Sequence, residues 1–238
     1  MRALRISLVV LAVLAGLFVA ADRIAVHLAE ERAAEQVAES EGLTGTESVS
    51  VSINGFPFLT QALGRELDEV DVELTGMTAE ARGRRITVTE VDAQLSHVRI
   101  GENFSSATAE QATGTARISY EDLTASAPTG VKVSYAGADR AARNQVRLTA
   151  SVQLLGQTVK IPRPFYSSVR LEGGDRVKLR AEEIPLGGIP GAEDRVRGLV
   201  DFGSTVHGLP EGLDLAEAEV TKEGVTFALE GQDVRLAG

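Results

Sequence analysis

The hydrophobic pattern divides the chain near residue 40. From Ile6 to Ala21 the chain has sixteen consecutive residues without a charge, preceded by two arginines and followed by Asp22 and Arg23. This run is longer than the core of most signal peptides, about 7–15 residues, and shorter than a typical spanning helix of about 20. The pattern predicts an export signal, which either stays as an anchor or is cleaved after the small residues that end the run.

The helical pattern continues beyond the apolar run, which favours an uncleaved anchor. Apolar residues recur at three- and four-residue spacing from Ile24 to Ala33, and no glycine or proline follows before Gly42. We therefore predict a signal-anchor transmembrane helix and stalk over residues 1–40, and an exported domain over residues 41–238. Arginines before the run keep the N-terminus inside, so the domain is expected outside the cell membrane, with cleavage and secretion as the alternative.

After Gly42 the pattern alternates with a period of two. Val49, Val51 and Ile53 share one face of a run, as do Val70, Val72 and Leu74, and such alternation predicts half-buried strands. Between these runs the apolar residues recur at helical spacing and predict a short amphipathic helix: Phe58, Leu59, Ala62, Leu63 and Leu67. Further alternating runs cover 86–88, 91–95, 98–100, 131–135, 146–154, 159–161, 169–171, 177–179 and 225–229.

Many strands and few helices place the domain in the mainly β (α+β) class, with a long antiparallel sheet. Two other short helices are predicted, at 119–123 and at 192–202. Ser119 and Asp122 fit a capping box at the start of the first of them.

The run at 146–154 has one apolar face and one polar face. The apolar face must be covered by helices, by the sheet itself, or by a bound apolar ligand. The segment 56–59 is a strand-to-helix corner that either packs into an ordinary core or forms the wall of a groove. The candidate groove-lining residues are Phe56, Phe58, Leu59, Leu63, Leu148 and Val152.

The composition excludes several kinds of binding and catalytic site. Cysteine is absent, which excludes disulfides, thiolate metal sites and a lipidated cysteine anchor. The net charge of −10 argues against a nucleic-acid partner. The three histidines, His27, His97 and His207, are scattered, and no catalytic motif accompanies them. We predict no catalytic residue, no metal and no cofactor.

Four blocks, at 48–77, 116–123, 148–161 and 204–236, together resemble the actinobacterial LmeA-like family of phospholipid-binding proteins. The resemblance implies a domain similar to the tubular lipid-binding (TULIP) superfamily, in which a curved antiparallel sheet and a helix enclose an apolar groove. It also implies association with envelope phospholipids, and it transfers no catalytic residue.

The expected function is therefore that of a membrane-anchored extracytoplasmic phospholipid-binding protein of the periplasm or cell envelope. Its expected partners are phospholipid, the cytoplasmic membrane and envelope-biosynthesis enzymes. The alternatives are an enzyme acting on envelope lipid, with a nucleophile and a base from distant positions, and a structural envelope protein with an ordinary packed core. A loss of activity on substituting His97 or His207 would favour the enzyme.

Overall fold

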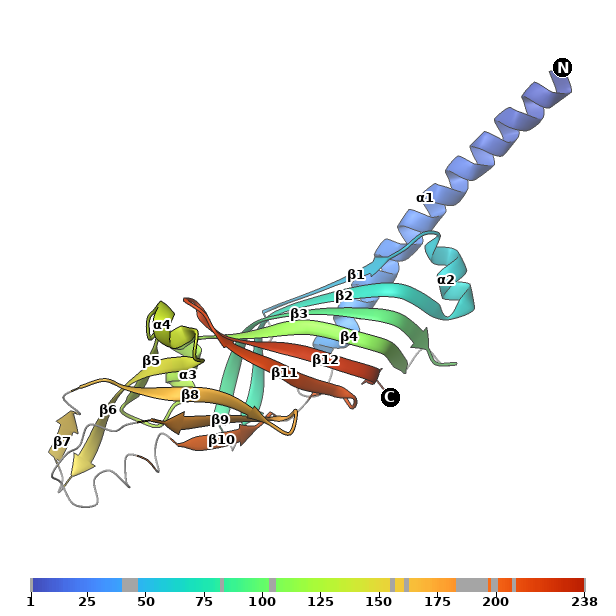
Figure 1. Cartoon of the computed structure of the whole chain (residues 1–238). Coiled ribbons are helices and arrows are strands. Elements are labelled where there is room, and N and C mark those ends of the chain that lie inside the picture. Colours follow the sequence, from blue (N-terminus) through green and yellow to red (C-terminus); the bar gives the residue numbers. More distant parts are fainter. Residues whose placement is uncertain are drawn as a thin grey trace.

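The computed structural model describes residues 2–39, 47–81, 84–102, 106–154, 157–160, 163–182, 197, 201–206 and 209–237. A long N-terminal helix, α1 (Arg2–Glu39), leads into a region of strands with three short helices among the described residues (Figure 1). These short helices are α2 (Phe58–Gly64), α3 (Tyr120–Ser126) and α4 (Ala138–Ala141).

The strands form two antiparallel sheets. The first has the order β1-β2-β3-β4-β12-β11. Its strands are β1 (Ser48–Asn54), β2 (Glu66–Ala81), β3 (Arg84–Ile100), β4 (Ala107–Ser119), β11 (Leu213–Val220) and β12 (Gly224–Ala237). The second has the order β10-β9-β8-β6-β5, with a further strand, β7, paired to β6. Its strands are β5 (Val131–Ser134), β6 (Gln145–Leu154), β7 (Gln157–Lys160), β8 (Phe165–Glu172), β9 (Arg176–Ala181) and β10 (Phe202–Thr205). The mainly β class with few helices is confirmed.

Several boundaries differ from the prediction. The three runs predicted between 86 and 100 form one strand, β3. The helix predicted to include Leu67 ends at Gly64, because Arg65 adopts a left-handed conformation with φ 56° and Leu67 already lies in β2, where it pairs with Val98 of β3. In the helix predicted at 192–202, Arg197 is helical and Phe202 begins β10, whereas most of the predicted helix lies outside the described residues.

Three strands, β4, β10 and β11, were not predicted. In β4 the most buried apolar residues are only alanines, Ala109 and Ala112, so the hydrophobic pattern is weak. Gly114 of β4 pairs with Ala93 of β3, and a Cβ at Gly114 would lie 2.4 Å from the carbonyl oxygen of Asp92. Glycine weakens a strand pattern in the sequence, although here the close approach of two backbones requires it.

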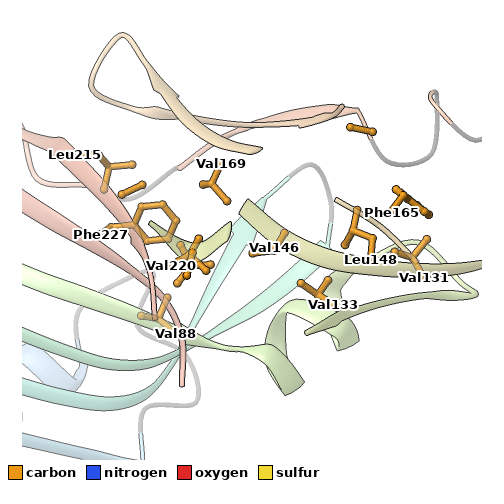
Figure 2. Close-up of a cluster of buried hydrophobic side chains, with 14 of the residues drawn as sticks. Val88, Val131, Val133, Val146, Leu148, Phe165, Val169, Leu215, Val220 and Phe227 are labelled. Carbon is orange, nitrogen blue, oxygen red and sulfur yellow. The ribbon is translucent and has the colours of Figure 1, made fainter. Parts of the chain in front are cut away.

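Two apolar clusters hold the domain together. The inter-sheet core contains side chains from both sheets, including Val88, Leu148, Phe165 and Phe227 (Figure 2). The helix-side core lies between the first sheet and the helices α1 and α2. Its buried members are Val26, Val51, Phe58, Leu67, Val70, Leu95, Val98, Ala109, Ala112 and Val234.

The second half of α1 packs on the first sheet instead of standing free as a stalk. Val26 is buried there, and Ala25, Ala29 and Ala33 pack beside it. The carboxylate of Glu30 accepts a hydrogen bond from the backbone N–H of Ile53 at 2.9 Å. Because β1 is an edge strand, this contact satisfies a donor that would otherwise face solvent. The helix therefore covers the edge of the sheet as well as part of its apolar face.

Candidate lipid-binding site

Four of the six candidate residues lie at the corner between β1 and α2. Phe58, the first residue of α2, is buried in the helix-side core, and Leu59 is half-buried. In contrast, the side chain of Phe56 is 58% exposed and that of Leu63 is 85% exposed. The corner therefore serves two purposes: Phe58 anchors it to the domain, whereas Phe56 and Leu63 face outward.

A contact from α1 fixes the position of this corner. Asp22 has no exposed surface, and its Oδ1 atom accepts a hydrogen bond from the backbone N–H of Leu59 at 2.9 Å. The first N–H groups of a helix have no partner inside the helix, so the carboxylate satisfies a donor that α2 leaves free. The other carboxylate oxygen accepts from Arg23 at 2.6 Å, and the Arg23 guanidinium lies 5.4 Å from the ring centroid of Phe56. Sequence reasoning treated Asp22 only as the end of the apolar run.

The remaining two candidates lie in the second sheet. Leu148 of β6 is 3% exposed and lies between its cross-strand partners Val133 of β5 and Phe165 of β8. The backbone of Val152 also lies in β6, where it pairs with Val159, but its side chain is outside the described part of the chain. Leu148 therefore belongs to the inter-sheet core, away from the α2 corner.

The two cores are nevertheless continuous. Four half-buried residues pack against both of them: Val37, Val49, Val72 and Leu213. Strand β2 shows the connection most simply, because Val70 belongs to the helix-side core, Val72 borders both, and Leu74 belongs to the inter-sheet core. These three residues alternate on one face of the strand, as the period of two predicted. One apolar interior therefore extends from the α2 corner to the second sheet.

An open apolar groove is not shown in the part of the chain that the structure describes. A pocket of about 420 Å³ lies instead over β3, β4 and β12, and it is lined by Arg99, Glu110, Gln111, Gln232 and Asp233. Arg99 and Asp233 form an ion pair at 3.6 Å. This lining is polar and charged, so it does not suit an acyl chain.

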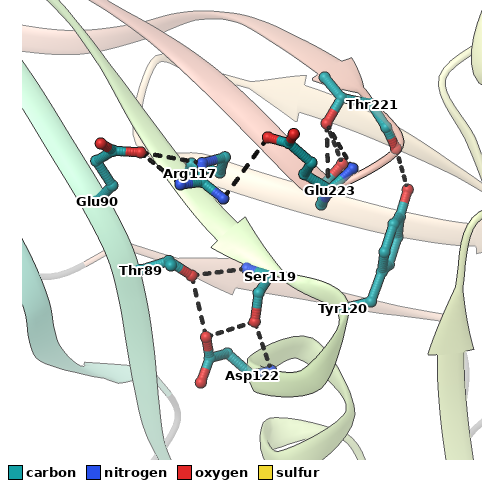
Figure 3. A network of polar contacts seen from close by, with 9 residues as sticks. Thr89, Glu90, Arg117, Ser119, Tyr120, Asp122, Thr221 and Glu223 are labelled. Atoms are coloured by element: carbon teal, nitrogen blue, oxygen red, sulfur yellow. Dashed lines mark hydrogen bonds and ion pairs between the residues drawn. The ribbon is translucent and has the colours of Figure 1, made fainter.

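A polar network surrounds the junction where β4 ends and α3 begins (Figure 3). Ser119 caps α3: its hydroxyl accepts from the N–H of Asp122 at 3.1 Å and donates to the carboxylate of Asp122 at 2.6 Å. The hydroxyl of Thr89 donates to the same carboxylate and accepts from the N–H of Ser119. The predicted cap is therefore confirmed, with Thr89 of β3 as an additional partner that only the tertiary structure supplies.

Tyr120 and Arg117, which lie beside this network, keep their protons at neutral pH. Burial raises the pKa of Tyr120 to about 12, with a smaller contribution from Tyr135, and the phenol donates to the carbonyl of Thr221. The hydrogen bond to Glu90 raises the pKa of Arg117, whose guanidinium lies 2.5 Å from that carboxylate. Neither group is suited to exchange protons near pH 7, so the network is suited to holding β3, β4 and α3 together.

The histidines are not brought together. His27 lies on α1 and is exposed, 3.4 Å from the carboxylate of Glu31, and His97 lies on β3 and is also exposed. His207 is outside the described residues. Within the described residues there is no group of three or more His, Cys, Asp or Glu side chains that could hold a metal ion.

Comparison with known proteins adds one match. The model of a family described as LmeA-like phospholipid-binding matches residues 20–230. The matched region begins just before Asp22 and includes the packed half of α1, the α2 corner and every buried member of the two cores except Val234. No curated protein and no solved structure matches the chain.

Proposed function

The chain belongs to the LmeA-like phospholipid-binding family, and from this premise we propose that it is a membrane-anchored extracytoplasmic protein that carries or presents phospholipid in cell-envelope biogenesis. The observation that carries the proposal is the apolar interior shared by the helix-side core and the inter-sheet core. Lipid binding without catalysis is the function for which this interior is suited. Its partners in this role are the cytoplasmic membrane and the envelope-biosynthesis enzymes that would receive the lipid.

An acyl chain would enter most easily between α1 and the first sheet. The helix presents short side chains there, Ala25, Ala29 and Ala33, beside Val26. Separating short side chains from a sheet exposes less apolar surface than separating long ones, so it costs less free energy. A chain lying there would bury its own methylenes at about 0.8 kcal/mol each, which offsets that cost. From this position the apolar interior continues toward Leu148 of the inter-sheet core.

The apolar half of α1 supports the anchor. One helix in the described part, Leu4–Ala38, is long and apolar enough to cross a membrane. Its large apolar residues from Ile6 to Val19 are exposed, so the domain provides no cover for them. The arginines at its start favour a cytoplasmic N-terminus and therefore an extracytoplasmic domain.

Protease protection tests this topology. Protease added to spheroplasts is expected to remove the domain and to leave a short membrane-bound fragment. A domain that resists protease until the cells are lysed would contradict the orientation. A domain found free in the medium would instead indicate that the signal is cleaved.

Lipid analysis of the purified full chain tests binding. Any membrane helix retains some surrounding lipid, so the matched control is a fusion of residues 1–21 to an unrelated soluble domain, purified in the same detergent. The full chain is expected to retain at least one additional phospholipid per molecule, measured by native mass spectrometry and organic extraction. Equal lipid content in the two proteins would contradict the proposal.

A pair of tryptophan variants tests the entry position. Ala29→Trp places a large side chain between α1 and the first sheet, whereas Ala38→Trp places it at an exposed position of the same helix. We expect phospholipid retention to fall in the first variant and to stay at the parent level in the second. Thermal unfolding of both variants shows whether the first has merely lost its fold. Unchanged retention in a folded Ala29→Trp variant would place the acyl chain elsewhere.

A further inference from the structure

Two apolar side chains at the α2 corner are exposed and do not pack in the apolar interior. Outside α1, the large hydrophobic residues that are exposed in the described part of the chain are Phe56 and Leu63. Both lie at the same corner, one just before α2 and the other near its end. Large apolar side chains that gather in one exposed place commonly mark a surface that contacts a partner or a membrane.

The hydrogen bond between Asp22 and Leu59 fixes the position of the α2 corner along the axis of α1. The sixteen residues from Ile6 to Ala21 rise about 24 Å at 1.5 Å per residue. The hydrocarbon core of a bilayer is about 30 Å thick. The run is about 6 Å shorter than this thickness, so Asp22, which directly follows it, lies within about 6 Å of the outer boundary of the hydrocarbon core. Because the Asp22 carboxylate binds the N–H of Leu59, the start of α2 lies at that same level.

The exposure of the α1 side chains also changes at Asp22. Before Asp22 the large apolar side chains are exposed on all sides of the helix, and from Asp22 onward one face is buried against the domain. Figure 1 shows the free half of α1 leaving the domain beside α2. The domain thus begins where the apolar segment ends, without an intervening stalk, and α2 is held next to the point of exit.

From this geometry we infer that Phe56 and Leu63 insert into the outer leaflet of the membrane that α1 crosses, a reading that rests on the anchor of the proposed function. The partner is the lipid surface itself. Short amphipathic segments bury an apolar face about 5–10 Å into the boundary between headgroups and acyl chains. Arg23, which is paired with Asp22, has a half-exposed side chain beside Phe56 and so borders the exposed apolar surface.

This second contact determines the orientation of the domain. A single helix leaves a domain free to rotate about the helix axis, and the net charge of −10 repels the domain from an anionic surface. Two inserted side chains to one side of α1 remove that freedom. The inserted side chains hold the α2 end of the helix-side core against the outer leaflet. In the proposed function, lipid is taken from this leaflet or delivered to it.

Site-specific labelling tests the insertion directly, because the chain contains no cysteine that would compete for the label. The full chain carries one new cysteine at a time, Leu63→Cys, Leu11→Cys or Asp139→Cys, each coupled to an environment-sensitive fluorophore. Position 11 reports on the anchor. Position 139 is the matched control, because it is exposed on α4, which lies far from α2 (Figure 1). Each protein is reconstituted in phosphatidylcholine vesicles that contain nitroxide-labelled phospholipid.

We expect the nitroxide lipid to quench the label at position 63 at least twofold more than the label at position 139, with a blue-shifted emission. Quenching at position 63 equal to that at position 139 overturns the insertion. The label at position 11 tests the anchor separately from the insertion. Strong quenching at position 11 confirms the anchor whatever position 63 shows. Weak quenching at position 11 overturns the anchor of the proposed function. Phospholipid retained by each variant in detergent, measured before reconstitution, reports on lipid binding independently of both positions.

Discussion

The carboxylate of Asp22 and the backbone N–H of Leu59 are 2.9 Å apart although 37 positions separate them in the chain. Through this hydrogen bond the end of the apolar half of α1 is attached to the start of α2. Asp22 is fully buried, so water cannot replace it as a partner for the N–H group of Leu59.

Replacing Asp22 should therefore release α2 locally. In Asp22→Leu the backbone N–H of Leu59 has no acceptor, and its amide hydrogen is expected to exchange roughly tenfold faster than in the parent. Asp22→Asn keeps an acceptor oxygen in place and is the matched control, with exchange close to the parent's. Hydrogen exchange followed by mass spectrometry measures both. Equal exchange in the parent and in Asp22→Leu would show that this bond does not hold α2.

Leu148 tests how tightly the inter-sheet core is packed. Leu148→Ala should lower the free energy of unfolding by about 2–5 kcal/mol, because the surrounding side chains cannot fill the space left between Val133 and Phe165. Thr149→Ala alters the exposed face of the same strand and should cost less than about 1 kcal/mol. Denaturant unfolding of lipid-free protein provides the comparison. A loss at Leu148 no greater than that at Thr149 would make Leu148 part of a groove wall.

Ser119 tests the cap of α3. Ser119→Ala removes the acceptor for the N–H of Asp122 and the donor to its carboxylate, and it should reduce the free energy of unfolding by about 1 kcal/mol. Ser52→Ala, at an exposed position of β1, is the control and should change it by less than about 0.5 kcal/mol. If the two variants unfold at the same denaturant concentration, the cap contributes nothing to stability.

Tyr120 should make stability depend on pH in the alkaline range. Its pKa is about 12 in the folded protein, whereas an unfolded tyrosine titrates near 10. Between these values the folded state binds more protons than the unfolded state, so the free energy of unfolding falls as pH rises from about 10 toward about 12. Below pH 10 this contribution is fully present.

The variant Tyr120→Phe isolates this effect. It loses the hydrogen bond to the carbonyl of Thr221, so it should be slightly less stable at pH 8. Its stability should then fall less steeply than the parent's between pH 10 and 12, because it has no phenol at this position. The measurement is the denaturant midpoint of both proteins across this range. Parallel curves would exclude Tyr120 as the titrating group.

Features that depend on neighbouring residues were predictable. The alternation of Val70, Val72 and Leu74 predicted a strand with one apolar face, and the structure confirms it. The cap at Ser119 was predictable for the same reason, since its partner Asp122 lies three residues away. Strand β11 carries a partly alternating pattern in Leu213 and Leu215 that could have identified it.

Features that depend on distant residues were not predictable. Strand β4 owes its place to pairing with β3 and β12, and its own residues, mostly Ala, Thr and Gly, have a weak preference for strands. The candidate residues illustrate the same limit. The hydrophobic pattern selected both Phe58 and Leu148, but it could not show that they belong to different cores connected through residues such as Val72.

By itself the amino-acid sequence determined the apolar N-terminal helix, the strand-rich class of the domain, which faces of the strands are apolar, and the phospholipid-binding family to which the chain belongs. These properties follow from the spacing and succession of residues along the chain. The tertiary structure alone decided that the second half of α1 packs on the first sheet, that Asp22 holds α2 at the end of the apolar run, and that two cores form one interior. Each of these depends on which distant side chains exclude water together, and the local pattern is compatible with many such arrangements.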